Sequence, residues 1–114
     1  MVKYSIVLVP FPFDDFSSVK VRPALCLTNE VGKHNHIIIA FISSKIPENQ
    51  LDSDLTIYIN TSDWVGTGLF VDSVIRLHKL VTIPKSLIKR KLGNVNQNLA
   101  DKLNTKLKTL FDVS

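Results

Sequence analysis

The sequence predicts a small, mostly β protein in which a strongly bent barrel of short strands is covered by one C-terminal helix. Short apolar or alternating segments, bounded by Pro, Gly, Asn or Asp, recur from the N-terminus to Val95 and are typical of strands. After Val95 the apolar spacing changes to that of an amphipathic helix. Because 114 residues suffice for one core and not for two, we expect a single domain over residues 1–114.

The first three predicted strands carry the densest apolar sequence. They cover Tyr4–Val9, Arg22–Thr28 and His36–Ser43. Pro10 ends the first strand because proline cannot donate a hydrogen bond to a ladder, and Phe11–Val21 follows as a loop. The third strand is apolar on both faces, which favours a central position in the sheet.

Shorter strands are predicted downstream. The segment Leu55–Asn60 alternates between apolar and polar residues, which is typical of a half-buried strand. Further strands are expected over Val71–Arg76, Leu77–Ile83 and Lys89–Val95. A polar loop, a glycine turn and a short helical turn are expected at Lys45–Asp54, Gly66–Gly68 and Lys85–Ile88.

The last segment predicts a helix packed on the barrel. Asn96 is the expected N-cap, since its side-chain oxygen can accept a hydrogen bond from an unpaired backbone amide. The apolar residues of this helix share one face, which would contact the core or, alternatively, a second subunit. They are Leu99, Leu103, Leu107, Leu110 and Phe111.

Charge is distributed unevenly along the chain. The 14 Lys and Arg residues exceed the 10 Asp and Glu residues, and the pI is near 9.3. The segment Ile46–Asp72 has five acids and no Lys or Arg, whereas Ser73–Ala100 has six basic residues and no acid. If the fold separates these segments, one face presents a positive field suited to phosphates. The alternative is two ordinary solvated surfaces.

Several classes of protein are not indicated. The single cysteine, Cys26, cannot form an intramolecular disulfide and lies in an apolar stretch typical of a core thiol. No signal peptide and no apolar run of about 20 residues is present, so we expect a cytoplasmic protein. Phosphate-binding glycine loops, CxxC pairs and nucleophile elbows are missing. His34 and His36 have no nearby third ligand, so neither a metal nor another cofactor is expected.

Arg22 is the most suggestive polar residue. It lies between Lys20 and Pro23 at the start of the second predicted strand, and arginine can bind a phosphate through two parallel hydrogen bonds. Ser43 and Ser44 end the third strand, and an antiparallel pairing of these strands would bring Ser43 near Arg22. A simple surface arginine and a strand-capping serine are the alternatives.

The order of several motifs resembles the PemK/MazF family of toxins over nearly the whole chain. The motifs are Ile6–Phe13, Lys20–Leu25, Ala40–Ser44, Asp72–Ile75 and Lys85–Gly93. The resemblance implies an SH3-like barrel, as in the MazF and CcdB toxins, and a homodimer. It also implies a toxin of a type II toxin–antitoxin system that arrests growth by cutting single-stranded RNA sequence-selectively and without metal. An acidic antitoxin would inhibit it, and the two would bind DNA as a complex.

The resemblance also implies a catalytic pair. The family's arginine before proline and its hydroxyl residue at the end of the third strand match Arg22 and Ser43, with Ser44 as the alternative. Many members have threonine where this chain has serine. Some members place a glutamate before the arginine, a position where this chain has only serines and Lys20, so the proton acceptor is left open.

Other residues are candidates for RNA contacts. Lys20 and Lys79 suit phosphates, and Phe16 suits stacking on unpaired bases, although Phe13 and Phe16 would equally fill the barrel. His78 is a candidate substrate contact that could also transfer a proton. The alternative functions are a CcdB-like toxin that poisons DNA gyrase without catalysis, and a silent binding module.

Overall fold

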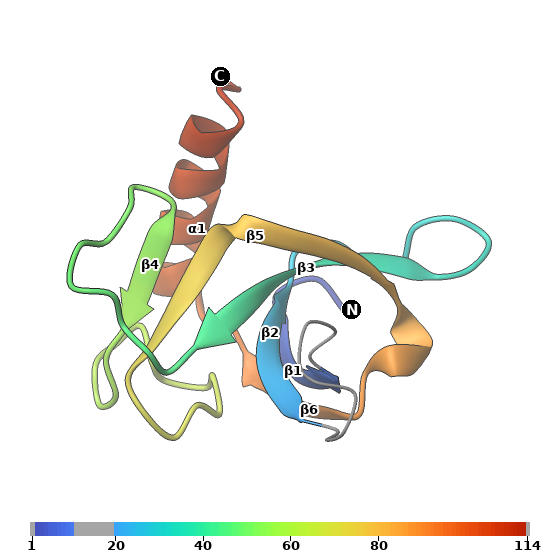
Figure 1. The fold of residues 1–114 in the computed structure, drawn as a ribbon, viewed down its shortest axis with the longest axis horizontal. Coiled ribbons are helices and arrows are strands. Elements are labelled where there is room, and N and C mark those ends of the chain that lie inside the picture. The colour runs from blue at the N-terminus through green and yellow to red at the C-terminus, as the bar shows by residue number, and fades with distance from the viewer. Residues whose placement is uncertain (1, 11–19, 114) are drawn as a thin grey trace.

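The computed structural model describes residues 2–10 and 20–113. Within them, an antiparallel sheet in the order β4-β5-β3-β2-β1-β6 curls into a half-barrel beside one α-helix (Figure 1). The predicted mostly β fold with a terminal helix is therefore confirmed. No described helix is long and apolar enough to cross a membrane. The elements are β1 (Ser5–Pro10), β2 (Val21–Cys26), β3 (His36–Ser43), β4 (Asp54–Ile57), β5 (Ser73–Pro84), the 3-10 turn η1 (Lys85–Leu87), β6 (Arg90–Asn94) and α1 (Gln97–Leu110).

Side-chain alternation along the strands supplies two apolar clusters, one on each face of the sheet. On β2, Leu25 joins the cluster that includes the α1 leucines, whereas Ala24 and Cys26 join the opposite cluster. On β3, Ala40 joins the first cluster and Phe41 the second. The central position predicted for the third strand is confirmed, since β3 lies between β2 and β5 and contributes to both cores.

The two strands predicted over Val71–Arg76 and Leu77–Ile83 are in fact one. β5 runs through both segments and bends strongly between them (Figure 1). The bend coincides with a large bulge in the β3–β5 pairing: Ala40 pairs with Leu80 and Ile42 with Ile75, so Phe41 is the single β3 residue opposite positions 76–79 of β5. The sequence pattern located the irregularity correctly but interpreted it as a break between strands.

The bulge also changes which β5 residues face which core. Ile75 before the bulge and Leu77 within it belong to the cluster under α1. After it, Leu80 packs against that cluster while Ile83 belongs to the opposite one. Odd-numbered residues thus exchange faces across the bulge, as extra residues in one strand require.

β4 is shorter than predicted. The sequence pattern extends to Asn60, but β4 ends at Ile57, and Asn60 has a φ of +65° that is incompatible with a strand. The carboxylate of Asp72 accepts a hydrogen bond from the amide of Ile59 at 2.8 Å. After β4 ends at Ile57, the Ile59 amide is therefore hydrogen-bonded to a side chain of the loop before β5.

The predicted N-cap of the helix is confirmed. The side-chain oxygen of Asn96 accepts a hydrogen bond from the amide of Leu99 at 3.0 Å. Leu99 and Leu103 are fully buried against the sheet, as expected for a core-facing helix, whereas Leu110 and Phe111 are exposed and do not join that core. The last helical turn extends beyond the edge of the sheet, so it has no core to cover (Figure 1).

The glycine turn before β5 is held against β6 by direct backbone contact. The carbonyl of Gly66 accepts a hydrogen bond from the amide of Asn94 at 2.8 Å. A Cβ at Gly93 would lie 2.3 Å from the Gly66 oxygen and 2.5 Å from the Thr67 carbonyl carbon. Only glycine at position 93 allows the turn to approach β6 this closely.

We expect Gly93→Ala to lower the free energy of unfolding by about 2–3 kcal/mol, because the clash is with backbone that cannot rotate away. Gly32→Ala is the matched control: a Cβ there meets nothing within 4 Å, and only its φ of +76° opposes the change. That control should cost about 1 kcal/mol. Urea unfolding measures both, and equal losses would contradict the close approach.

Candidate functional site

A cavity of about 800 Å³ opens where β2 begins, β3 ends and β5 bulges. It collects most of the predicted site residues. Arg22, Ser43, Ser44, His78 and Lys79 all line it. Residues separated by more than fifty positions in the sequence are therefore brought to one surface by the antiparallel sheet.

Arg22 and Ser43 occupy corresponding positions on neighbouring strands. The β2–β3 pairing runs through Leu25↔Ala40 and Ala24↔Phe41, and continuing this register sets Arg22 opposite Ser43. Both also follow the alternation that sends Ala24 and Phe41 to the same face of the sheet. The β2–β3 pairing ends at Ala24↔Phe41, and both Arg22 and Ser43 line the same cavity beyond that point.

The hydroxyl of Ser43 has a defined local partner. Its Oγ accepts a hydrogen bond from the amide of Lys45 at 3.0 Å, which caps the end of β3. A hydroxyl that accepts one bond still has its own proton to donate. Capping and donation to a ligand are therefore compatible in Ser43, and the cap orients the oxygen.

The bulge of β5 supplies the opposite wall. Arg76, His78 and Lys79 all lie in the bulged segment and all line the cavity. In a regular strand the consecutive residues His78 and Lys79 would point to opposite faces. The bulge allows both to contribute to one surface.

A buried carboxylate lies behind this wall. The side chain of Asp54 is 0% exposed, and its Oδ1 accepts a hydrogen bond from Nε of Arg76 at 2.9 Å. Its Oδ2 accepts one from the amide of Leu51, also at 2.9 Å. Burial alone would raise the pKa of the Asp54 carboxyl, but the Leu51 amide and the Arg76 guanidinium together lower the pKa below its ordinary value.

His78 is attached to the same cluster. Its Nδ1 shares a 2.8 Å hydrogen bond with the hydroxyl of Ser53 and lies 3.9 Å from Oδ1 of Asp54. The imidazole remains 30% exposed on the cavity side. The Nδ1 atom is thus held by Ser53, while the ring itself lines the cavity.

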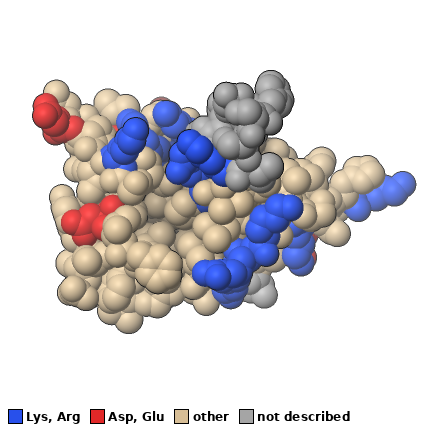
Figure 2. Space-filling model, turned by 60° about the horizontal axis from the view of Figure 1, so that its bottom comes forward, with Lys and Arg blue, Asp and Glu red and all other residues tan. Residues whose placement is uncertain are grey.

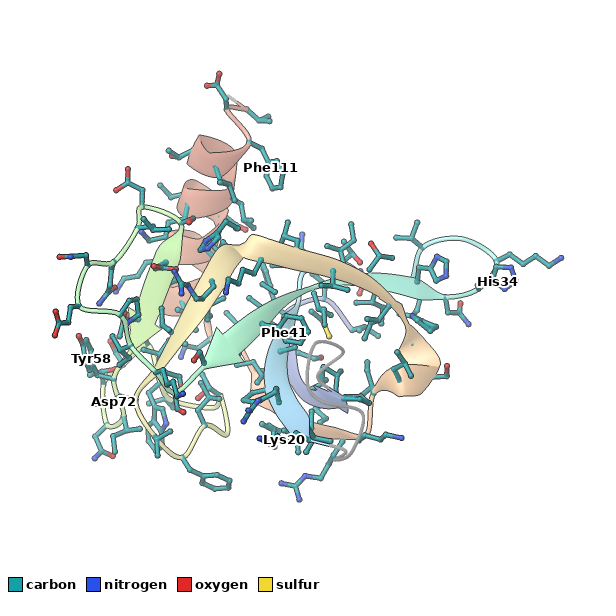
Figure 3. All side chains as sticks on the ribbon, viewed as in Figure 1. Lys20, His34, Phe41, Tyr58, Asp72 and Phe111 are labelled. Carbon is teal, nitrogen blue, oxygen red and sulfur yellow. The ribbon has the colours of Figure 1, made fainter. Side chains whose placement is uncertain are left out.

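Other sequence candidates fall elsewhere. Lys20 is exposed just before β2 and is not among the described residues of the cavity wall, and Phe13 and Phe16 lie outside the described residues (Figure 3). His34 lies at the tip of the β2–β3 connection, far from Phe41, and its ring centroid is 6.0 Å from that of His36. Within residues 2–10 and 20–113, no group of three His, Cys, Asp or Glu residues is placed to hold a metal ion.

Cys26 behaves as the sequence predicted for a core thiol. It is fully buried in the second apolar cluster. Burial raises the pKa of its thiol to about 11, against a smaller opposing effect of Lys91. A thiol that stays protonated at neutral pH is a poor nucleophile.

Sequence reasoning missed several residues of the cavity wall. Arg76 and Arg90 were visible only as members of a basic segment, and Lys45 and Phe70 only as loop residues. Phe70 is 82% exposed although it is a large aromatic residue. Its position directly after the glycine turn was the one available signal.

The wall is strongly cationic. Five described residues of the cavity wall are Lys or Arg and none is Asp or Glu. Figure 2 shows Lys and Arg side chains spread over the face that is turned forward there, with acidic groups towards one end. The cationic residues of the wall are Arg22, Lys45, Arg76, Lys79 and Arg90. Uneven charge in the sequence thus becomes a local positive surface suited to a polyanion.

The family model of the PemK-like, MazF-like toxins of type II toxin–antitoxin systems matches residues 3–111. The chain belongs to this family. Three solved toxin-like structures share the fold of this PemK/MazF-family protein, and none of the curated protein sequences matches it. At 23% identity or below, these similarities establish the fold.

The structural relatives are matched along almost their entire lengths. Toxin MazF-mt6 of Mycobacterium tuberculosis is 23% identical with a TM-score of 0.72, over 96% of this chain and 98% of that chain. A mycobacterial endoribonuclease in complex with its cognate antitoxin is 14% identical with a TM-score of 0.72, over 100% and 97%. MazF from Deinococcus radiodurans is 14% identical with a TM-score of 0.67, over 99% and 97%.

We expect Asp54→Asn to lower the free energy of unfolding at neutral pH by about 2–3 kcal/mol, because Arg76 loses its charged partner while staying mostly buried. Since the folded-state pKa of Asp54 is lowered, its contribution is present above the ordinary pKa and is lost as pH falls below about 4. Urea unfolding as a function of pH should show a smaller acid-side loss for the variant.

The matched control is Asp52→Asn, an exposed aspartate two residues away. It should leave both the stability at neutral pH and the acid-side loss close to those of the wild type. Equal effects of the two substitutions would contradict a stabilising role for the buried ion pair.

Proposed function

We propose that this PemK/MazF-family protein is an endoribonuclease that cleaves single-stranded RNA sequence-selectively and without metal, and that it arrests growth as the toxin of a type II toxin–antitoxin system. The observation that carries the proposal is the shared cavity. Arg22 and the hydroxyls of Ser43 and Ser44 lie on a wall whose charged residues, among those described, are all cationic. Such a surface attracts a phosphate and surrounds it with donors.

The chemistry needs little more than this wall. RNA carries its own nucleophile, because the 2′-hydroxyl beside the scissile phosphate can attack in line and leave a cyclic phosphate. Arg22 neutralises the charge that develops on the non-bridging oxygens. Ser43 donates a hydrogen bond to one of them, and one such donor in a preorganised site contributes about 3 kcal/mol.

RNA binding would use the cations and aromatics around the cavity. Lys45, Lys79 and Arg90 line the wall and suit flanking phosphates, while Lys20 lies beside it. The exposed ring of Phe70 suits stacking on an unpaired base, the usual way in which proteins bind single-stranded RNA. Phe16 is retained as a second stacking candidate.

The proposed partners follow from the family and from the surface. Exposed apolar side chains adjoin the cavity at Ile59 and Val71, which supports a homodimer through this region. One structural relative is an endoribonuclease bound to its cognate antitoxin. For this protein we propose an acidic antitoxin that covers the cationic wall, DNA binding by the toxin–antitoxin complex, and action in the cytoplasm.

Purified protein should cut a long single-stranded RNA into discrete fragments in the presence of EDTA. Arg22→Ala should slow cleavage at least a hundredfold, corresponding to about 3 kcal/mol of lost transition-state stabilisation. Lys33→Ala, an exposed cation at the distant β2–β3 turn, is the matched control and should cut normally. A deoxy substitution at the nucleotide preceding the cut should abolish cleavage, and continued cutting would exclude 2′-hydroxyl attack.

Intact RNA combined with inhibited DNA supercoiling would instead support the CcdB-like alternative. Intact RNA with no effect on supercoiling would support a silent binding module. Near-normal cutting by Arg22→Ala would remove Arg22 from the catalytic site.

The same assay should distinguish the roles of Ser43 and Ser44. Ser43→Ala should slow cleavage about a hundredfold, because the donor to the phosphate is lost. Ser44→Ala should change the rate less than tenfold, since Ser44 does not continue the register with Arg22. Ser43→Thr keeps the hydroxyl and should retain activity. The reverse order of effects would assign the role to Ser44.

A further inference from the structure

We propose that His78 is the general base of this site and takes the proton from the attacking 2′-hydroxyl of RNA. The inference rests on the proposed function and supplies the proton acceptor that Arg22 and Ser43 lack. An arginine side chain is not deprotonated in proteins, and a serine hydroxyl is a weak base. Among the described residues of the cavity wall there is no Asp or Glu, so the imidazole is the side chain suited to accept a proton near neutral pH.

The contacts of the His78 imidazole are those that a general base requires. In the tautomer that the proposal requires, the Nδ1–H group donates to the hydroxyl oxygen of Ser53 at 2.8 Å, and Oδ1 of Asp54 lies 3.9 Å from Nδ1. In the described part of the chain no hydrogen bond engages Nε2. A base is effective when a second group orients it from behind and leaves the other nitrogen for the substrate.

The bulge in β5 is what brings this histidine to the cavity. Residues 76–79 lie across from Phe41 alone, and His78 lies in the middle of that segment. The groups that contact the imidazole are Ser53, just before β4, and Asp54, the first residue of β4; the charged groups beside it on β5 are Arg76 and Lys79. Asp54 is already paired with Arg76, so its carboxylate does not compete for the substrate's proton.

The proposed step is balanced within the substrate, the protein and water. As the 2′-oxygen forms its bond to phosphorus, its proton moves to Nε2 of His78. The bond from phosphorus to the 5′-oxygen breaks, and that oxygen takes a proton from water. The products are a 2′,3′-cyclic phosphate and a 5′-hydroxyl, and the imidazolium then releases its proton to solvent.

The decisive measurement is the pH profile of single-turnover cleavage by the wild type and by His78→Gln, which keeps a polar side chain but cannot accept a proton. The wild-type rate should rise with pH and level off as the imidazole loses its proton. His78→Gln should cut about a hundredfold more slowly and lack that inflection. Near-normal cutting by His78→Gln, or an unchanged inflection, would overturn the proposal.

Chemical rescue provides the second measurement. Added imidazole should raise the cleavage rate of His78→Ala at least tenfold, in proportion to the concentration of its free-base form. It should leave Arg22→Ala inactive. His34→Ala, a histidine at the distant hairpin turn, is the matched control and should behave as the wild type (Figure 3). Thermal unfolding of each variant checks that the fold is retained.

The outcomes separate this inference from the proposed function. Wild-type cleavage that depends on Arg22 but is indifferent to His78 would retain the endoribonuclease and exclude only the histidine base. A wild-type protein that leaves RNA intact would exclude both.

Discussion

The candidate site depends on the mismatch between β3 and β5. Phe41 is the single β3 residue opposite positions 76–79, so β5 must bend and change its facing pattern there. β5 pairs with β4 along one edge over its first residues, and with β3 along the other edge on both sides of the bulge. Because a bulge frees consecutive residues from strict alternation, His78 and Lys79 line one cavity together. A regular β5 would send one of them to the opposite face.

The buried carboxylate of Asp54 stabilises this irregular segment. It lies at the start of β4 directly opposite Arg76, at the edge of the bulge. Its hydrogen bonds to Arg76 and to the Leu51 amide connect the bulge to the preceding loop. The ion pair lies on the β4 side of β5, where the pairing is regular, and it determines where the Arg76 guanidinium lies. Structural stability and the charge of the cavity wall therefore depend on one interaction.

Much of the fold could be predicted from the sequence because alternation and helical spacing report burial directly. The central β3, the Asn96 cap and the buried α1 leucines followed from such patterns, and Arg22 was singled out by its place before a proline at a strand start. The bulge could not be predicted, because a change of facing pattern within one strand has the same signature as a turn between two. Phe70 and Lys45 were missed for another reason: a loop residue joins a site through tertiary approach, which leaves no local periodicity.

The charged residues in the described part of the cavity wall are all cationic, and this has a chemical consequence. Such a wall concentrates phosphate and stabilises the charge of a phosphorane-like transition state, but cations cannot accept the proton that the nucleophile must lose. Asp54, which lies next to the wall, is fully buried and neutralised by Arg76, so it neither repels an incoming phosphate nor reaches a substrate hydroxyl. Its influence extends to the cavity through His78, which lies 3.9 Å away and can carry a proton between substrate and solvent. The negative charge of Asp54 would obstruct RNA binding if it were exposed. It is instead buried next to the imidazole of His78.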